Sequence, residues 1–308
     1  MVGGFLTEAL LFGMREQGAS AQSVTLLVRS PANPNLAAVE QFPESEVLVA
    51  DLAHWKPDRD FDYVFHAASP ASPTQYGDVA AVVDSNLGFA TTLVSEAPRF
   101  GRILFVSSGE VYGAAPPSPV PETYIGNPDT ALDRAVYGVS KMRTERLLLD
   151  NVASTRVARL HHTFGPGMRE HDGRSFADFI WAAARGEDLV LRSPGADART
   201  FLYSADAVRG MFDITLSSSG DRVFNLGSDE PMTIRRFAET VSEVSGVGVR
   251  FPDDQLHDGY EHSPIQQLVP DLGRLRSLGW APRVGVREAV RRTLQWVRGV
   301  REPKERSE

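Results

Sequence analysis

The chain has 308 residues, of which 42% are hydrophobic and 23% are charged, and its net charge is −8. This length allows one large domain or two smaller domains that share a cleft. The acidic charge argues against a nucleic-acid surface, the absence of cysteine excludes disulfides and thiolate chemistry, and the lack of a long apolar run or a basic leader predicts a cytoplasmic protein without a membrane span.

The chain opens on the segment MVGGFLTEALL, followed by a helical pattern over 6–17. Nucleotide-binding domains of the doubly wound type begin with a strand and a glycine-rich turn, which presents a helix N-terminus to a pyrophosphate. Only the last part of such a turn is recognisable here, at Gly4, Phe5 and Leu6. Either the start is mis-assigned or trimmed, or the sheet has lost an inner strand together with most of the phosphate-binding turn.

Short apolar segments alternate with helical patterns through the first half of the chain. Nearly continuous apolarity is typical of strands buried on both faces, and the alternation predicts a parallel sheet with right-handed crossovers. We therefore predict an α/β fold with a Rossmann-type doubly wound parallel sheet. Strands are expected at 24–28, 47–50, 63–67, 103–107 and 155–160, and helices at 6–17, 78–97 and 135–151.

Small and polar residues follow three of the expected strands. Asp51 follows the second strand, Ala67–Ser69 the third, and Ser107 and Ser108 the fourth. Ligands of open parallel sheets bind outside the carboxyl ends of the strands. We therefore expect the three strand ends to converge on one crevice.

Tyr137 and Lys141 are four residues apart in AVYGVSKM, in a chain with only three lysines and seven tyrosines. Positions i and i+4 share one face of a helix. A nearby lysine lowers the pKa of a phenol, which can then act as a general base beside a hydroxyl from Ser107 or Ser108. The alternative is an exposed tyrosine and lysine on a solvated helix face.

The second half of the chain has a looser pattern. The Pro-rich segment 113–128 is a candidate substrate loop, because it is too long for a simple connection. Helices are expected at 176–186 (ending at Gly186), 206–216 (capped by Ser204 or Asp206), 233–246 (ending at Gly246) and 287–300, with a strand at 222–227. The expected units are a dinucleotide-binding domain over 1–160 with 201–227 returning to it, a smaller α/β substrate-binding region over 161–200 and 228–300, and a frayed tail over 301–308.

Several segments along the chain carry a family resemblance, among them FHAASPASP, VSSGEVYG, YGVSK, RLHHTFGPGM, ARTFLYSADAV and FNLGSDEPMTI. On these segments the chain resembles the extended short-chain dehydrogenase/reductases of the NAD-dependent nucleotide-sugar epimerase/dehydratase family. Within that family it is most similar to the UDP-glucuronate decarboxylases. The resemblance implies a nucleotide-sugar substrate, bound NAD and a homodimer formed through the helices at 78–97 and 135–151.

The resemblance also implies residue roles. Tyr137 would take the proton of the sugar 4-OH while hydride passes to NAD⁺, Lys141 would hold the nicotinamide ribose, and Ser108 would bond the reacting oxygen. A 4-keto-glucuronate is a β-keto acid and loses CO₂ readily, and returning hydride then gives a UDP-pentose. Glu110 would work at C5.

The implied cofactor-binding residues are Gly4, Phe5, Leu6, Arg29, Asp51, Leu52, Ala67, Ala68, Ser69, Asn86, Ser107, Tyr137 and Lys141. The implied substrate-binding residues are Ser72, Glu110, Arg134, His162, Arg174, Phe176 and Arg199, of which Arg199 would pair with the carboxylate.

Two positions depart from the decarboxylase pattern: Gly109 stands where those enzymes carry a hydroxyl, and His162 stands where the family has Asn. Glu110 could instead be a solvated carboxylate, Arg199 a surface salt-bridge residue, and Ser107 a buried, hydrogen-bonded serine. Arg29 leaves NADP open beside NAD. No metal site is expected, because the seven histidines lack a ligand spacing.

Three other functions stay open from the sequence. The chain could be a nucleotide-sugar 4-epimerase, or a 4-ketosugar reductase or dehydratase in a natural-product or polysaccharide pathway. A third alternative is a cofactor-free pseudoenzyme that acts as a binding subunit. Intact Tyr137, Lys141, Glu110 and Arg199 argue against the pseudoenzyme.

Overall fold

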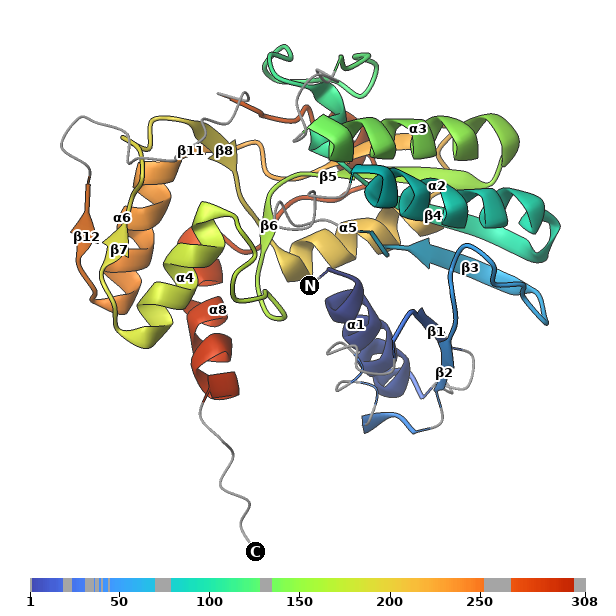
Figure 1. Cartoon of the computed structure of the whole chain (residues 1–308), viewed down its shortest axis with the longest axis horizontal. Coiled ribbons are helices and arrows are strands. Elements are labelled where there is room, and N and C mark those ends of the chain that lie inside the picture. The colour runs from blue at the N-terminus through green and yellow to red at the C-terminus, as the bar shows by residue number, and fades with distance from the viewer. Residues whose placement is uncertain are drawn as a thin grey trace, which may run out of the picture.

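A computed structural model describes residues 2–18, 24–30, 36, 39, 41–43, 45–69, 79–127, 135–251 and 267–301. Helices and strands alternate along most of the chain (Figure 1). Their order is α1 (Val2–Glu16), β1 (Thr25–Val28), β2 (Glu46–Val49), β3 (Phe61–His66), α2 (Val79–Ser95), η4 (Ala97–Arg99), β4 (Phe100–Ser108), η5 (Gly109–Tyr112), α3 (Val136–Asn151), β5 (Thr155–Leu160), β6 (Thr163–Phe164), α4 (Ser175–Arg185), β7 (Leu189–Val190), β8 (Ala198–Thr200), β9 (Leu202–Tyr203), α5 (Ser204–Leu216), β10 (Val223–Leu226), β11 (Pro231–Thr233), α6 (Ile234–Ser245), β12 (Val249–Arg250), α7 (Gly273–Ser277) and α8 (Val286–Arg301).

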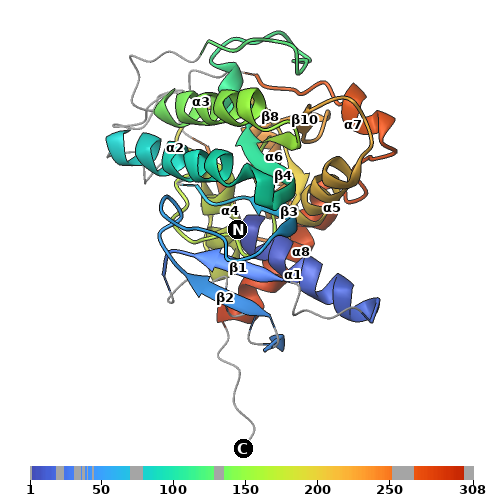
Figure 2. The same ribbon diagram turned by 90° about the vertical axis from the view of Figure 1, so that its right-hand side faces the viewer.

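The main sheet is parallel, with strand order β10-β5-β4-β3. Side chains of β4 alternate between its two faces, as the period of a strand requires. Ile103 and Phe105 pack with α2 and α3, whereas Leu104 and Val106 pack with α5 and Leu6 of α1. Helices therefore cover both faces of the sheet (Figures 1 and 2), and the predicted doubly wound α/β fold is confirmed.

The strands β1 and β2 form a separate two-stranded parallel sheet. Burial of the first three strands on both faces, expected from their apolarity, is wrong: Val47, Val49 and Tyr63 are 37%, 51% and 50% exposed. The reason is the division of the sheet between β1 and β3: within the described residues, β1, β2 and β3 each have a strand partner on one side only. In a doubly wound sheet of the common order, another strand lies between the two strands at this place.

The first helix begins earlier than the predicted range of 6–17. Val2, Phe5, Leu6 and Ala9 recur at helical spacing and pack against the core cluster on the α5 face of the sheet. This apolar stripe continues the helix back to Val2, so Gly4 lies in the first turn of α1 rather than in a preceding loop.

A second group of elements packs α4, α6 and α8 around one apolar cluster beside the sheet (Figure 1). As predicted, α4 ends at Gly186 and α6 at Gly246, which have φ values of 74° and 83° in the left-handed region. No helix in the described part of the chain is long and apolar enough to cross a membrane. Of the expected frayed tail, 302–308 lies outside the described residues.

The predicted cap of α5 is wrong. The N-cap residue is Tyr203, and Ser204 and Asp206 lie inside the helix. The Asp206 carboxylate instead accepts hydrogen bonds from the backbone N–H groups of Arg283 and Val284, both at 2.9 Å. Asp206 therefore ties α5 to the segment that leads into α8.

Candidate active site

Tyr137 and Lys141 lie on one face of α3, packed against the end of β4. They are 9% and 2% exposed, so the alternative of an exposed pair on a solvated face is excluded. Gly138 permits the close approach of α3 to η5, because a Cβ there would lie 2.6 Å from the carbonyl oxygen of Glu110. The Lys141 ammonium lies 5.8 Å from the centroid of the Tyr137 ring.

The Tyr137 hydroxyl meets groups from two other elements. The Ser108 side chain hydrogen-bonds to it and also accepts the N–H of Glu110 at 3.2 Å. Burial, and then the charge of Glu110, raise the pKa of Tyr137 to about 12, while Arg174 and Ser108 act in the opposite direction. Ser108 therefore contacts the phenol, and Glu110 and Arg174 lie near enough to shift its pKa through their charges.

The expected lowering of the Tyr137 pKa by Lys141 is wrong in this geometry. The Lys141 ammonium donates to the carbonyl oxygen of Val106 at 2.9 Å and lies over the ring faces of Phe105 and Tyr137 rather than beside the hydroxyl. Burial lowers the pKa of Lys141 to about 7, opposed by the charge of Glu145. The four-residue spacing of Tyr137 and Lys141 predicted that they share one helix face, but it could not predict the direction in which the Lys141 side chain points.

A chain of hydrogen bonds connects the end of β3 to Tyr137. The Ser69 hydroxyl donates to Asn86 Oδ1 at 2.7 Å, Asn86 Nδ2 donates to Ser140 Oγ at 2.9 Å, and Ser140 Oγ donates to the carbonyl oxygen of Tyr137 at 2.9 Å. Asn86 and Ser140 are fully buried. Ser140 was missed from the sequence, although its position three residues after Tyr137 places it on the same helix face.

Two buried polar side chains near Lys141 have no hydrogen-bond partner within the described residues, namely Ser107 and His66. Both are 2% exposed. Ser107 was expected to be buried and hydrogen-bonded, and only its burial is found. His66 was missed from the sequence; its ring lies edge-on to Phe89 at 4.4 Å, and burial, then the Lys141 charge, hold its pKa well below the usual value.

Two of the expected substrate residues of the second half, His162 and Arg174, contact the Phe176 ring. His162 contacts that ring edge-on at 5.9 Å, and Arg174 stacks over it at 5.1 Å while pairing with Asp172. Phe176 itself is 2% exposed and belongs to the apolar cluster of α4, α6 and α8. Arg199 is 6% exposed and donates to the carbonyl oxygen of Ala198 at 2.9 Å, so it is not a surface residue.

The expected cofactor residues of the N-terminal part lie at two separate places. Gly4 and Leu6 are buried in the first turns of α1, with Phe5 half-buried between them, and an added Cβ at Gly3 would lie 3.6 Å from Ala67. At the second place, the Asp51 carboxylate bonds to the His54 ring at 2.7 Å and the Ala53 N–H at 3.1 Å.

The bonds to His54 and Ala53, aided by the nearby Arg29, lower the pKa of Asp51. Leu52 packs with Trp55 in the core beneath. Because β2 belongs to the separate sheet, only the ends of β3 and β4, with Ala68 and Ser108, share one sheet edge. Two of the three expected strand ends therefore share a sheet edge, and their convergence with Asp51 on one crevice stays a prediction. Ser72 and Arg134 lie outside the described residues.

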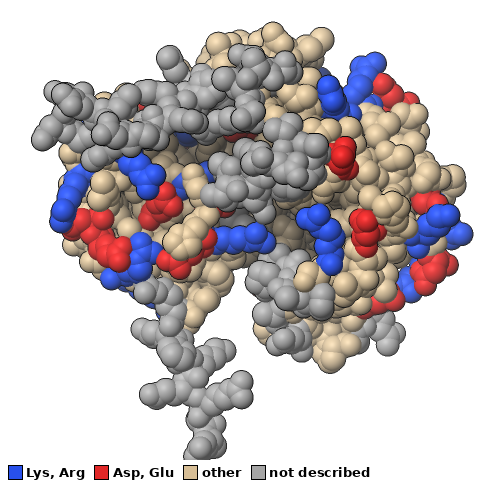
Figure 3. All heavy atoms as spheres, in the orientation of Figure 1, with Lys and Arg blue, Asp and Glu red and all other residues tan. Residues whose placement is uncertain are grey.

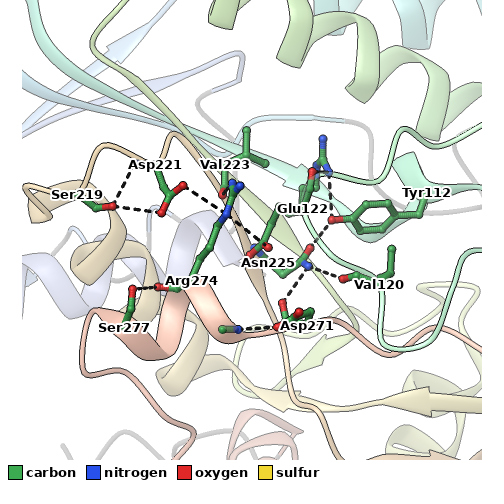
Figure 4. Close-up of polar contacts among 12 residues, drawn as sticks. Tyr112, Val120, Glu122, Ser219, Asp221, Val223, Asn225, Asp271, Arg274 and Ser277 are labelled. Carbon is green, nitrogen blue, oxygen red and sulfur yellow. Dashed lines mark hydrogen bonds and ion pairs between the residues drawn. The ribbon is translucent and has the colours of Figure 1, made fainter.

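A buried polar network fixes the segment after η5 to the sheet (Figure 4). Asn225 of β10 accepts the Tyr112 hydroxyl at 2.6 Å and donates to the carbonyl oxygens of Val120 and Asp271 at 2.9 and 3.0 Å. Its backbone N–H donates to the Glu122 carboxylate at 2.9 Å. The candidate substrate loop is thus anchored at Val120 and Glu122, beside the residues around Tyr137.

A cavity of about 660 Å³ lies elsewhere, between α6, α8 and β11. Its arginines are paired with glutamates: Arg236 contacts Glu243 at 2.7 Å and Arg291 contacts Glu288 at 2.7 Å. Acidic and basic side chains are likewise interspersed on the face shown in Figure 3. This groove lacks the buried, shifted groups that surround Tyr137, so we place the candidate site at Tyr137.

Comparison with known proteins finds relatives in sequence and in fold. The model of the NAD dependent epimerase/dehydratase family matches residues 1–227. UDP-glucuronic acid decarboxylase 3 of Arabidopsis thaliana is 32% identical over 239 residues, which are 75% of this chain and 68% of that protein. UDP-glucuronic acid decarboxylase 1 of Xenopus tropicalis is 31% identical over 249 residues, 78% of this chain and 57% of that protein.

Solved structures share the fold over nearly the whole chain. A UDP-N-acetylglucosamine 4-epimerase from Methanobrevibacter ruminantium M1, in complex with UDP-N-acetylmuramic acid, has a TM-score of 0.79 at 21% identity, covering 97% of this chain and 96% of that one. UDP-glucuronic acid 4-epimerase from Bacillus cereus, in complex with UDP-glucuronic acid and NAD, has a TM-score of 0.79 at 19% identity and the same coverage. At these identities the likeness supports the fold.

Proposed function

Because the chain belongs to the NAD dependent epimerase/dehydratase family, we propose that it modifies a nucleotide sugar through transient oxidation at C4, and that its reaction is the decarboxylation of UDP-glucuronate to a UDP-pentose. The relatives named UDP-glucuronic acid decarboxylases support this choice. The observation that carries it is the surroundings of the buried Tyr137 hydroxyl, which hydrogen-bonds to Ser108 and whose pKa is shifted by the charges of Glu110 and Arg174.

The residues at the start of α1 fit a dinucleotide phosphate. The first turn contains Gly3 and Gly4, carries no acidic side chain, and lies beside Ala67 at the end of β3. Helix N-termini bind phosphate through free N–H groups and a positive dipole end. We propose that this turn holds the diphosphate of NAD, that Asp51 bonds the adenosine ribose and that Lys141 bonds the nicotinamide ribose.

When bound, NAD supplies the hydride acceptor for the sugar C4 and later returns the hydride. Tyr137 takes the proton of the 4-OH and gives it back to the same oxygen at the end of the cycle. Ser108 and Arg174 favour the phenolate that this step needs, whereas burial and Glu110 oppose it. Arg199 pairs with the C5 carboxylate, and Glu110, half-buried beside Tyr137, acts at C5 after CO₂ has left.

Epimerisation at C4 is the second candidate, because one observation favours it. Gly109 provides no hydroxyl beside Glu110, where the decarboxylases that the chain resembles have one. Dehydration is disfavoured, because that position also lacks an acid, and burial lowers the pKa of the adjacent His161 to about 4, which leaves its ring neutral at working pH.

The test is incubation of the purified chain with UDP-glucuronate and NAD⁺, with products identified by NMR. We expect a UDP-pentose and one CO₂ for each sugar consumed. A 4-epimer that keeps its carboxylate would replace decarboxylation by epimerisation, and stoichiometric NADPH consumption on a 4-ketosugar would indicate a reductase. If the chain binds no nicotinamide dinucleotide, the result would favour the cofactor-free pseudoenzyme that acts as a binding subunit.

The matched variant is Tyr137→Phe, which removes one hydroxyl from the cluster. We expect turnover to fall by about 10³-fold or more, because the proton acceptor is lost, while the unfolding midpoint stays close to that of the wild type. Wild-type turnover in this variant would refute the assignment of Tyr137.

We also propose that the chain forms a homodimer through α2 and α3, which lie side by side on one face of the sheet (Figure 1). Light scattering measures the mass in solution. A monomer at micromolar concentration would refute the dimer and leave the catalytic proposal intact.

A further inference from the structure

The imidazole of His161 occupies the space that a side chain at position 109 would fill. A Cβ added to Gly109 would lie 2.9 Å from Cε1 and Nδ1 of that ring and 3.2 Å from Nε2. Gly109 is the first residue of η5, between Ser108 and Glu110. The ring therefore abuts the backbone of the turn that carries both side chains.

The ring is enclosed from the other sides as well. A Cβ added to Gly227 would lie 2.9 Å from the His161 Cβ, and the Tyr112 ring centroid lies 6.2 Å from the imidazole. His161 is 5% exposed. Close packing of this kind allows the His161 ring only one position. The ring therefore limits where the backbone of the turn at Gly109 can lie.

The imidazole acts through this shape rather than through its nitrogens. Neither ring nitrogen has a hydrogen-bond partner in the described part of the chain. Asn225 lies close enough to the ring to raise the His161 pKa, but its amide donates to the carbonyl oxygens of Val120 and Asp271 rather than to the ring, and burial outweighs its effect. Burial lowers the pKa of His161 to about 4, so the ring is neutral and exchanges no proton at working pH.

We propose that His161 is a positioning residue whose ring replaces a side chain at position 109 and holds the turn of Ser108 and Glu110 against Tyr137. This inference rests on the proposed function, because it concerns residues that would act on the sugar. It predicts that positions 109 and 161 are coupled in size: adding volume at one is tolerated only when volume is removed at the other.

The first test needs no activity. Unfolding midpoints are measured for Gly109→Ala, His161→Ala and the double variant. We expect Gly109→Ala to lower the midpoint by overpacking, and the double variant to lose less than the sum of the single losses, as contacting residues do. Additive losses would overturn the proposal.

The second test measures kcat and KM of the full chain with UDP-glucuronate and NAD⁺. Gly109→Ala should lower kcat by about 10- to 100-fold with little change in KM, because a displacement near 1 Å costs rates of this size. When His161 is already Ala, adding Gly109→Ala should raise kcat by about ten-fold relative to His161→Ala alone, because the new methyl group fills part of the space left by the imidazole. Loss in both backgrounds would overturn the coupling.

A conservative variant separates shape from chemistry. His161→Phe keeps the ring volume without nitrogens and should retain kcat within about three-fold, with an unchanged pH profile. A loss as large as that of His161→Ala would show that the nitrogens act, and it would overturn the proposal.

Gly101→Ala is the matched overpacking control. Its Cβ would lie 2.6 Å from the carbonyl oxygen of Asp62, at the opposite end of β4 from Ser108. We expect a lower unfolding midpoint with unchanged kcat per folded molecule. A kcat loss in this control equal to that of Gly109→Ala would overturn the proposal. If the unfolding midpoints of the variants are coupled but the wild-type chain shows no turnover, the proposed function has failed and the positioning role of His161 stands.

Discussion

At the scale of single residues, the candidate site concentrates buried titratable groups whose surroundings oppose their charged forms. Tyr137, Lys141 and His66 are all nearly inaccessible, and burial is the largest cause of each pKa shift. Such groups cost stability, and they gather where their reactivity is used. A stabilising substitution at this site should therefore remove function.

Lys141→Met tests this trade-off. Burial lowers the pKa of Lys141 from 10.5 to about 7, so the wild type loses stability as pH falls from 10.5 to 7 and this loss is complete below 7. We expect the variant to raise the free energy of unfolding at pH 7 by a few kcal/mol. The gain should vanish near pH 10.5, and turnover should be lost at both pH values.

Urea unfolding at the two pH values measures the effect of Lys141→Met. Lys56→Met is the control, because Lys56 is exposed and removing its charge should change the free energy of unfolding by less than about 0.5 kcal/mol at either pH. Equal effects of the two substitutions would mean that Lys141 is hydrated in solution.

At the scale of elements, the network around Asn225 joins three segments that are distant in sequence. Its amide links β10 to Val120 in the candidate substrate loop and to Asp271 before α7, and its oxygen holds Tyr112 of η5 (Figure 4). A fully bonded buried network specifies one arrangement of the segments that it joins. Asn225 therefore contributes to the position of the loop together with the backbone bonds between Val120 and the segment 269–271.

Asn225→Leu should destabilise the protein by about 3 kcal/mol or more, because it removes the acceptor of the buried Tyr112 hydroxyl and one donor each from the carbonyl oxygens of Val120 and Asp271. Limited proteolysis within 113–127 should also become faster. Asn151→Leu is the control: Asn151 also donates to a carbonyl oxygen, that of Leu147 at 2.8 Å, but it is exposed. Equal losses in the two variants would show that burial does not decide the cost.

Sequence patterns located the elements well where the signal was local. The run at 155–160 matches β5, and the glycines at 186 and 246 end α4 and α6, because a left-handed C-terminal residue is a local requirement. The Tyr137 and Lys141 pair was found by helical spacing.

Features that depend on distant neighbours could not be predicted. The apolarity of β1 and β3 suggested burial, but burial depends on which strands lie beside them. The Lys141 direction, the bonds of Asn225 and the contact between His161 and Gly109 are set by residues far away in the chain. Asn225 interrupts an apolar strand, and this was the one sequence signal for the network.

At the scale of the whole molecule, the division between β1 and β3 has a dynamic consequence. Within the described residues, β1 and β2 pair as strands only with each other, and Leu11, Val24, Val39 and Phe42 give them and α1 a small core of their own. Packing of Leu27 and Leu6 and the bond from Arg59 to Thr25 at 2.7 Å attach this part to the rest. Such a part can open locally without unfolding of the main sheet.

Amide hydrogen exchange should reveal this breathing, with β1 and β2 exchanging much faster than β4. A dinucleotide would contact both the β1–β2 sheet and the main sheet, with its adenosine end at Asp51 and its nicotinamide end at Lys141. It would therefore hold the two sheets together. Slower exchange in β1 and β2 should then require the intact dinucleotide, whereas AMP and nicotinamide mononucleotide added together would leave the two parts free to separate.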